Sequence, residues 1–157
     1  FEEPLQQACL AAPRFRVSTL GPLKVFDDSY NASPPSMRAA LAALALHQGG
    51  RRFAALGDMF ELGPMADAAH AELGEQAASH GVDQLFTLGE QASRVAESAR
   101  AAGLTGAAAY ESHEAIARAV LDVAQPGDAL LVKGSRGMRM EGVIKALENL
   151  LSPEGTA

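Results

Sequence analysis

The chain alternates short apolar runs with longer helical stretches, and this alternation constrains its fold more than any other feature. Six runs have the length and composition of strands: residues 16–20, 23–26, 53–56, 84–88, 107–110 and 129–132. The helical stretches span about residues 36–48, 66–80, 90–102, 113–124 and 140–151. This spacing is typical of an α/β fold in which a mostly parallel sheet, here of about six strands, carries helices on both faces.

Glycine, proline and capping residues mark the expected ends of these elements. Residues 21–22 are a Gly-Pro pair, which predicts a turn between the first two strands. Residues 34–35 are two prolines at the start of the first helix, where a missing N–H costs nothing, and residues 49–50 are two glycines after its end. Ser112 can cap a later helix, with Glu114 in its first turn.

Composition narrows the class of protein. The chain has 157 residues, enough for one domain, and its net charge of −6 argues against nucleic acid as a partner. The single cysteine, Cys9, excludes an internal disulfide and fits a cytoplasmic protein. No apolar run has membrane-spanning length and no signal peptide is recognisable, so we expect no membrane insertion. Because the first residue is Phe rather than Met, we expect the chain to be part of a longer protein.

Polar segments follow three of the strands, and ligands of parallel sheets bind beyond the carboxyl ends of the strands. The first segment spans residues 27–33. Its acids, among them Asp28, could accept hydrogen bonds from ligand hydroxyls or hold a metal, and Tyr30 and Asn31 could contact a base or a sugar. The alternative is an ordinary polar loop that caps the following helix.

The second and third segments span residues 57–63 and 133–139. In the second, a glycine allows close approach of a ligand, although the spacing is not that of a dinucleotide fingerprint. Asp58 and Glu61 could bind cationic groups or simply face water. The third carries three cations and two glycines before a helix, which favours an anion-binding loop.

Histidine spacing gives little evidence for a functional role. His70 lies inside a predicted helix, where packing or a local hydrogen bond competes with a role in a site, and the other three lie near helix ends, where capping or exposure is expected. No His, Cys or Asp spacing resembles a metal site, so none is predicted. The chain also lacks a G-x-x-x-x-G-K-[ST] loop. Any phosphoryl chemistry therefore needs a phosphate-binding loop from elsewhere.

Taken in order, the three segments resemble the Mur ligase family. Residues 27–34 are similar to the D-D-x-Y-N-A-N-P signature of the branch that adds D-alanyl-D-alanine, residues 56–63 to its L-G-D-M-x-E-L-G, and residues 133–136 to its K-G-S-R. The resemblance runs from about residue 10 to residue 151. Ser33 replaces the usual Asn of the first signature, and Pro13 replaces the Gly of a G-R pair.

The resemblance implies a three-domain bacterial enzyme of which this chain is the third domain. Residues 1–12 would be a linker or the tail of a central ATPase domain, and residues 13–157 a Rossmann-like C-terminal domain. The full enzyme would be a cytoplasmic monomer that acts in peptidoglycan synthesis. It would use ATP to phosphorylate a carboxylate of UDP-N-acetylmuramoyl-tripeptide, and the amine of D-alanyl-D-alanine would attack the acyl phosphate. The central domain would supply most of the contacts to Mg²⁺. The isolated chain would be inactive.

Residue roles carried over from the family are implied by the resemblance alone. The expected ATP contacts are Arg14 at the phosphates, Asp28 at the ribose, and Tyr30 and Asn31 beside the nucleoside. The residues expected to face the acceptor dipeptide are Lys133, Ser135 and Arg136. Weaker candidates for the site are Asp58, Glu61 and His70.

Two other functions remain open on the sequence. The chain could be the corresponding domain of folylpolyglutamate synthetase, although the Y-N-A and K-G-S-R segments argue against it. It could also be a free-standing module that binds a nucleotide or an anion without catalysis.

Overall fold

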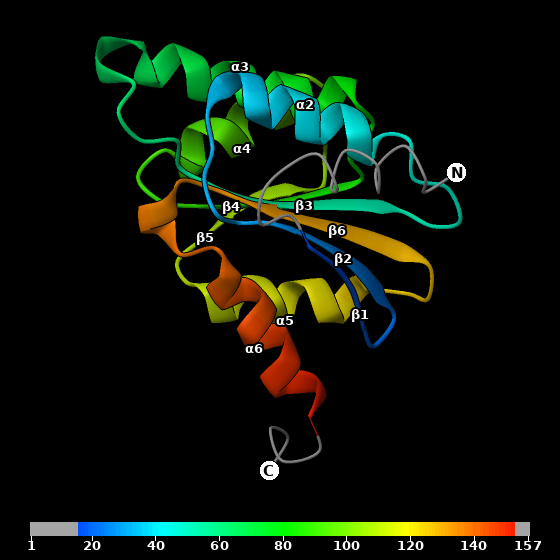
Figure 1. Cartoon of the computed structure of the whole chain (residues 1–157). Coiled ribbons are helices and arrows are strands. Elements are labelled where there is room, and N and C mark those ends of the chain that lie inside the picture. The colour runs from blue at the N-terminus through cyan, green and yellow to red at the C-terminus, as the bar shows by residue number, and fades with distance from the viewer. Residues whose placement is uncertain (1–15, 153–157) are drawn as a thin grey trace.

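A six-stranded sheet with the order β1-β2-β6-β3-β4-β5 forms the centre of the molecule (Figure 1). The computed structural model describes residues 16–152. The strands are β1 (Arg16–Leu20), β2 (Leu23–Asp28), β3 (Arg52–Gly57), β4 (Gln84–Leu88), β5 (Ala107–Tyr110) and β6 (Asp128–Lys133). β1 pairs with β2 in an antiparallel hairpin, and all other neighbours are parallel. The predicted fold class, a mostly parallel α/β sheet, is therefore confirmed.

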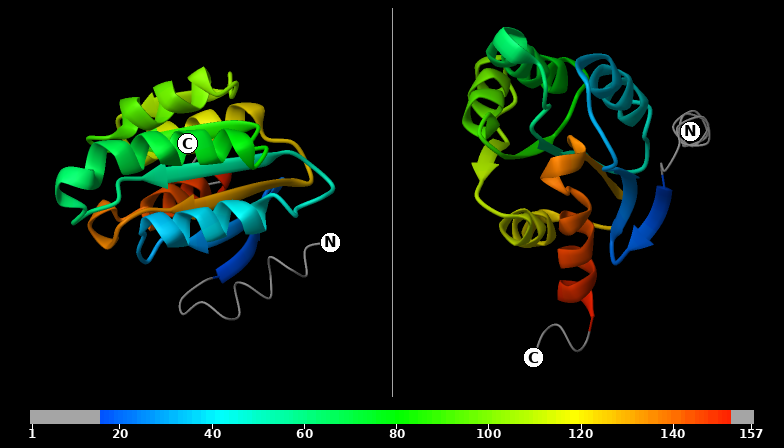
Figure 2. Two further views of the ribbon diagram at one scale, coloured as in Figure 1. Left: turned by 90° about the horizontal axis from the view of Figure 1, so that it is seen from above. Right: turned by 60° about the vertical axis from the view of Figure 1, so that its left-hand side comes forward.

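Helices cover both faces of the sheet, as Figure 1 and the right-hand view of Figure 2 show. One face carries α2 (Pro34–Leu44), α3 (Ala66–Ser79) and α4 (Ala92–Ala101), and the other carries α5 (His113–Val123) and α6 (Glu141–Leu151). Two short 3₁₀ turns, η1 (Gly63–Met65) and η2 (Arg136–Met138), precede α3 and α6. Within residues 16–152, no helix is both long and apolar enough to cross a bilayer.

Burial of β6 on both faces makes it the centre of the core. All six of its residues are buried. Ala129 and Leu131 belong to the apolar cluster under α2, α3 and α4, whereas Leu130 and Val132 belong to the cluster under α5 and α6. A strand that is covered on both sides has a continuous apolar sequence, and residues 129–132 have such a sequence. The polar Asp128 and Lys133 at its two ends were not predicted to lie within it.

The first helix ends earlier than its apolar pattern predicts. Ser33 caps α2, because its Oγ accepts the backbone N–H of Ser36 while the Ser36 Oγ accepts the N–H of Ser33. α2 stops at Leu44 rather than near residue 48. Beyond it the chain turns inward and buries His47, whose Nε2 lies 2.8 Å from the carbonyl oxygen of Gly127. The expectation that His47 caps a helix or is exposed is therefore wrong.

A close contact between α3 and α4 depends on Gly74. A Cβ at this position would lie 2.3 Å from the carbonyl oxygen of Val95 and 2.8 Å from the backbone nitrogen of Ala99. Both obstacles are backbone atoms of α4, which cannot rotate away as a side chain can. The two helices therefore pack at a distance that only glycine permits.

We expect Gly74→Ala to destabilise the domain by about 1–3 kcal/mol through overpacking. The direction of the change in stability distinguishes the two cases. If the helix had room for a Cβ, replacing glycine by alanine would stabilise the domain by up to about 1 kcal/mol. Urea denaturation measures the free energy of unfolding. The neighbouring exposed position supplies a control, Glu75→Ala, which should change it by less than about 0.5 kcal/mol. Higher stability of Gly74→Ala would show that α3 and α4 do not pack this closely.

Candidate functional site

The three polar segments gather at one edge of the sheet. β6 lies between β2 and β3, and all three strands are parallel, so their carboxyl ends meet on the same side. In the strand register, Asp28 pairs with Lys133 and Lys133 pairs with Leu56. The segments that follow, residues 29–33, 58–63 and 134–139, therefore adjoin one another. The turn η2 marks this edge on the left of Figure 1.

An ion pair between a buried lysine and a half-buried aspartate joins two of these strand ends. The Nζ of Lys133 lies 2.8 Å from Oδ2 of Asp28 and donates a second hydrogen bond of 3.0 Å to the carbonyl oxygen of Asn31. The Lys133 side chain is 3% exposed and that of Asp28 18%. Burial raises the pKa of Asp28 above its ordinary value, although the hydrogen bond and charge of Lys133 act in the opposite direction. Lys133, expected to face the acceptor dipeptide, is thus bound to Asp28 and Asn31, which are expected to contact the nucleotide.

A cavity of about 260 Å³ opens beside this ion pair, lined by Asp28, Tyr30, Asn31, Ala32, Ser33, Ser36 and Lys133. It therefore brings together the described residues predicted to contact ATP. The amide oxygen of Asn31 accepts the backbone N–H of Ala32, and Tyr30 is 44% exposed. Arg14, the remaining predicted ATP contact, lies outside the described residues.

The second and third segments hold each other through direct contacts. The backbone N–H of Ser135 donates to the carbonyl oxygen of Asp58 at 2.9 Å, and the Ser135 hydroxyl accepts the N–H of Phe60 at 2.7 Å. The ring of Phe60 also packs on Gly137, where a Cβ would lie 2.5 Å from the ring. Ser135 is 4% exposed, so in this structure it positions the neighbouring loop.

Two of the weaker candidates also make internal contacts. The carboxylate of Asp58 accepts the backbone N–H groups of Glu90 and Gln91 at 2.8 and 3.0 Å, which fixes the turn before α4. His70 is 1% exposed, and its Nε2 accepts the N–H of Met59 at 2.9 Å while its Nδ1 lies 2.7 Å from the carbonyl oxygen of Ala66. Because Nε2 is the acceptor, Nδ1 carries the proton and donates.

In the third segment, the exposed side chain of Arg136 contacts Glu141 and the ring of Tyr30. Its guanidinium forms an ion pair with the carboxylate of Glu141 and lies 5.7 Å from the ring centroid of Tyr30. Burial opposes ionisation of Glu141, but the hydrogen bonds and charge of Arg136 outweigh it and hold the pKa of Glu141 below its ordinary value. Arg139 follows with a left-handed backbone, φ 49°. Arg136 is 46% exposed on its side chain, so a ligand can still reach it.

A larger cavity, of about 520 Å³, lies next to the second segment. Its lining combines apolar side chains with three carboxylates: Asp58, Met59, Phe60, Glu61, Leu62, Gly63, Ala66, His70, Gly89, Glu90, Gln91 and Met138. Its volume is in the range of small-molecule sites. Phe60 and Met138 lie in the second and third predicted segments without being singled out as candidates, whereas Glu90 and Gln91 lie outside all three segments. Glu90 and Gln91 follow the end of β4, where the rule on strand ends could have found them.

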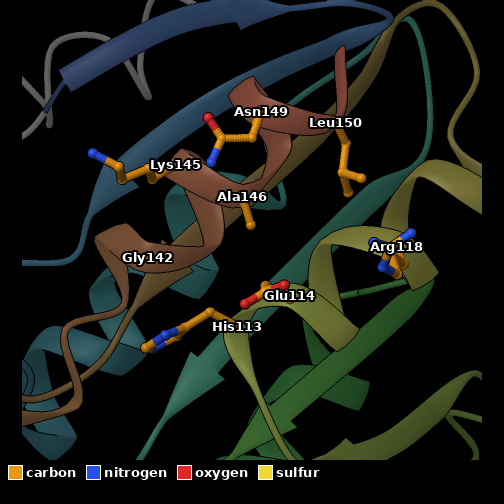
Figure 3. Close-up of a pocket in the computed structure, with 8 residues that line it drawn as sticks. All are labelled: His113, Glu114, Arg118, Gly142, Lys145, Ala146, Asn149 and Leu150. Carbon is orange, nitrogen blue, oxygen red and sulfur yellow. The ribbon is translucent and has the colours of Figure 1, made fainter. Parts of the chain in front are cut away.

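A separate cavity of about 400 Å³ lies between α5 and α6, on the other face of the sheet (Figure 3). In Figure 3 the carboxylate of Glu114 points from α5 toward α6, whereas Lys145 points away from the groove. Next to it, His113 packs on Gly142 and its Nε2 contacts the carbonyl oxygen of Met138 at 2.9 Å. None of the predicted site residues within residues 16–152 lines this cavity.

The described residues give no protein site for a metal ion. Residues 16–152 contain no group of three or more His, Cys, Asp or Glu side chains that could bind one. The carboxylate of Asp28 is bound to Lys133, and that of Asp58 accepts two backbone N–H groups. This donor set does not fit Mg²⁺, so no chemical step is assigned to a metal here.

The model of the family described as Mur ligase, glutamate ligase domain, matches residues 14–136. The chain belongs to this Mur ligase family. The matched region includes the Asp28–Lys133 ion pair and the loop of residues 57–63. The three segments that resemble the family signatures thus lie at one edge of the sheet.

Individual Mur ligases are similar to the chain over most of its length. UDP-N-acetylmuramoyl-tripeptide–D-alanyl-D-alanine ligase of Bacillus subtilis is 35% identical over 133 residues, 83% of this chain and 29% of that protein. The enzyme of the same name from Escherichia coli is 38% identical over 79% of this chain and 26% of that protein. The crystal structure of MurF ligase from Thermotoga maritima in complex with ADP has a TM-score of 0.77 and 29% identity, over 88% of this chain and 31% of that one. The chain thus spans well under half the length of these relatives.

We expect Lys133→Met to destabilise the domain by about 3 kcal/mol near pH 7, because the half-buried carboxylate of Asp28 loses its cation. The pKa of Asp28 is raised in the folded state, and loss of Lys133 raises it further. Between the unfolded and folded pKa values the folded variant binds more protons, so its deficit should shrink as pH falls. Urea denaturation at about pH 7 and about pH 5 measures this.

The double variant Lys133→Met with Asp28→Asn is the control, because it removes both charges. It should recover most of the lost stability and show little additional pH dependence. An equal deficit for Lys133→Met at both pH values would indicate that Asp28 does not depend on this cation.

Proposed function

We propose that the chain is the C-terminal domain of an ATP-dependent ligase that joins D-alanyl-D-alanine to UDP-N-acetylmuramoyl-tripeptide in peptidoglycan synthesis. The observation that carries the proposal is the similarity, over about four fifths of the chain, to relatives that bear this name. We further propose a cytoplasmic, monomeric bacterial enzyme. The alternatives of a folylpolyglutamate synthetase domain or a free-standing binding module are not favoured by these relatives.

The nucleotide half of the proposal rests on the ion pair and its cavity. Oδ2 of Asp28 is bound to Lys133, which leaves Oδ1 to accept ribose hydroxyls. Lys133 would then act through Asp28, by fixing its carboxylate at the cavity wall, while Tyr30 and Asn31 flank the nucleoside. A relative of this fold has been determined with ADP, which supports an adenine nucleotide as the ligand. Arg14 keeps its proposed role at the ATP phosphates.

The acceptor half rests on the segment after β6. Arg136 and Arg139 are both exposed in this segment, and the planar guanidinium of Arg136 can bind the dipeptide carboxylate with two hydrogen bonds. To do so it would exchange its contact with Glu141 for the ligand. Ser135 would support the acceptor indirectly, because its hydroxyl already holds the N–H of Phe60. Lys133 is directed to Asp28, so a contact with the dipeptide would require it to leave that partner.

The proposed reaction needs more than this chain. No phosphate-binding loop of the G-x-x-x-x-G-K-[ST] type occurs in its 157 residues, and the described part offers no metal site. Mg²⁺ and the phosphate-binding loop would therefore come from the central domain. The contribution of this chain is to bind the nucleoside, orient the acceptor amine and exclude water from the acyl phosphate. We expect the isolated chain neither to hydrolyse ATP nor to form the amide bond.

In the full-length enzyme, we expect Asp28→Ala to raise the ATP KM by at least ten-fold, because a hydrogen bond to a charged group is worth about 1.5–3 kcal/mol. The KM for the UDP-tripeptide should change little. Steady-state kinetics with each substrate varied in turn measures both. Asp122→Ala, the same change at an exposed carboxylate on α5, is the matched control. An unchanged ATP KM and turnover in Asp28→Ala would rule out the ribose contact.

A further inference from the structure

We propose that Phe60, supported by Met138, forms the wall that recognises the small apolar side chains of the acceptor, and that it determines how large those side chains can be. The inference rests on the proposed function, because it names the part of the site that the D-alanyl-D-alanine methyl groups would contact. Position 60 lies in the one variable place of the second family signature, so the resemblance assigns it no role.

The first argument is that Phe60 is exposed and yet held in place. The residue is 46% exposed, which is unusual for an aromatic residue that serves only the core. Its backbone N–H is bound to the Ser135 hydroxyl at 2.7 Å, and its ring packs directly on Gly137. Both contacts come from the segment after β6, at a distance in sequence of more than 70 residues. A rigid, exposed aromatic ring binds a ligand at low cost in entropy.

The second argument is the shape and chemistry of the cavity that Phe60 lines. Phe60, Leu62, Ala66 and Met138 give it an apolar wall within about 520 Å³. This wall would cover methyl groups but has no polar atoms with which to select a larger polar side chain. A few polar groups in a largely apolar pocket are the usual arrangement for orienting a small ligand.

The third argument is charge. Glu61 and Glu90 line the same cavity, and among residues 16–152 neither forms an ion pair with a basic side chain. Asp58 adds negative charge, although its oxygens already accept two backbone N–H groups. A ligand with an ammonium group and small apolar side chains matches this lining. A free dipeptide of two alanines has that chemistry, whereas ATP, with several negative charges, is repelled from it.

The experiment uses the full-length enzyme and varies ATP, UDP-tripeptide and acceptor separately. The probes are D-alanyl-D-alanine and the bulkier D-alanyl-D-leucine. The variants are Phe60→Ala, which removes the ring, and Gly137→Ala, which displaces it by adding a Cβ in its place. Leu46→Ala is the matched control, because Leu46 is 47% exposed and lines neither the cavity at Phe60 nor the one at Asp28. Phe60→Leu tests whether a smaller apolar side chain restores part of the dipeptide binding that Phe60→Ala loses.

We expect Phe60→Ala to raise the KM for D-alanyl-D-alanine about ten-fold, as for a contact residue in a binding pocket, with KM for ATP and UDP-tripeptide within about two-fold. The preference for D-alanyl-D-alanine over D-alanyl-D-leucine should fall by a similar factor. Gly137→Ala should change the same quantities in the same direction, Phe60→Leu should restore part of the loss, and Leu46→Ala should change none of them.

Two results would overturn the inference. One is a loss in turnover with all three substrates alike and an unchanged preference between the two dipeptides, which would make Phe60 a contact with the rest of the enzyme. The other is wild-type kinetics in Phe60→Ala. Failure of the proposed function is distinguishable from both, since the wild-type enzyme itself would then not use either dipeptide as an acceptor.

Discussion

The burial of a cation at the end of the central strand is the constraint on which the site depends. β6 is covered on both faces, so Lys133 emerges from an apolar core and is only 3% exposed. A buried ammonium must be paired and hydrogen-bonded, and Asp28 with the carbonyl oxygen of Asn31 provides both. The segment after β2 is therefore fixed relative to β6, and the cavity beside Asp28 has a defined wall.

The other half of the edge is organised by contacts between loops rather than by strands. Ser135 binds both the carbonyl oxygen of Asp58 and the N–H of Phe60, so the segments after β6 and β3 are held as one unit. Asp58 extends this unit to the turn before α4, and His70 closes the loop of residues 59–66 onto α3. Three stretches distant in sequence, near residues 58–70, 90–91 and 135, are thus joined by hydrogen bonds, which suits a site that must keep a small ligand in one orientation.

The sequence predicted the architecture well because local patterns determine it. Strand and helix periodicity, with glycine and proline at the boundaries, gave β4 and β5 to the residue, and Ser112 caps α5 as expected. The rule on strand ends also predicted where the three polar segments lie, and the strand register brings them to one edge of the sheet. The sequence could not predict which side chains distant along the chain contact one another. The direction of Lys133 toward Asp28 and the fixing of Phe60 on Gly137 arise from strand order and loop packing, which no local pattern contains. His47 was misjudged for the same reason, since its partner lies 80 residues away.

The central claim is that nucleotide and acceptor both bind at the carboxyl edge, on either side of the segment after β6. Hydrogen–deuterium exchange of the full-length enzyme tests it most directly. A non-hydrolysable ATP analogue should protect the amides of residues 28–33, and addition of D-alanyl-D-alanine should add protection in residues 58–63 and 136–139. The groove between α5 and α6 should be unaffected by either ligand. Protection confined to residues 113–118 and 142–150 would contradict the account, because the ligands would then bind on the other face of the sheet.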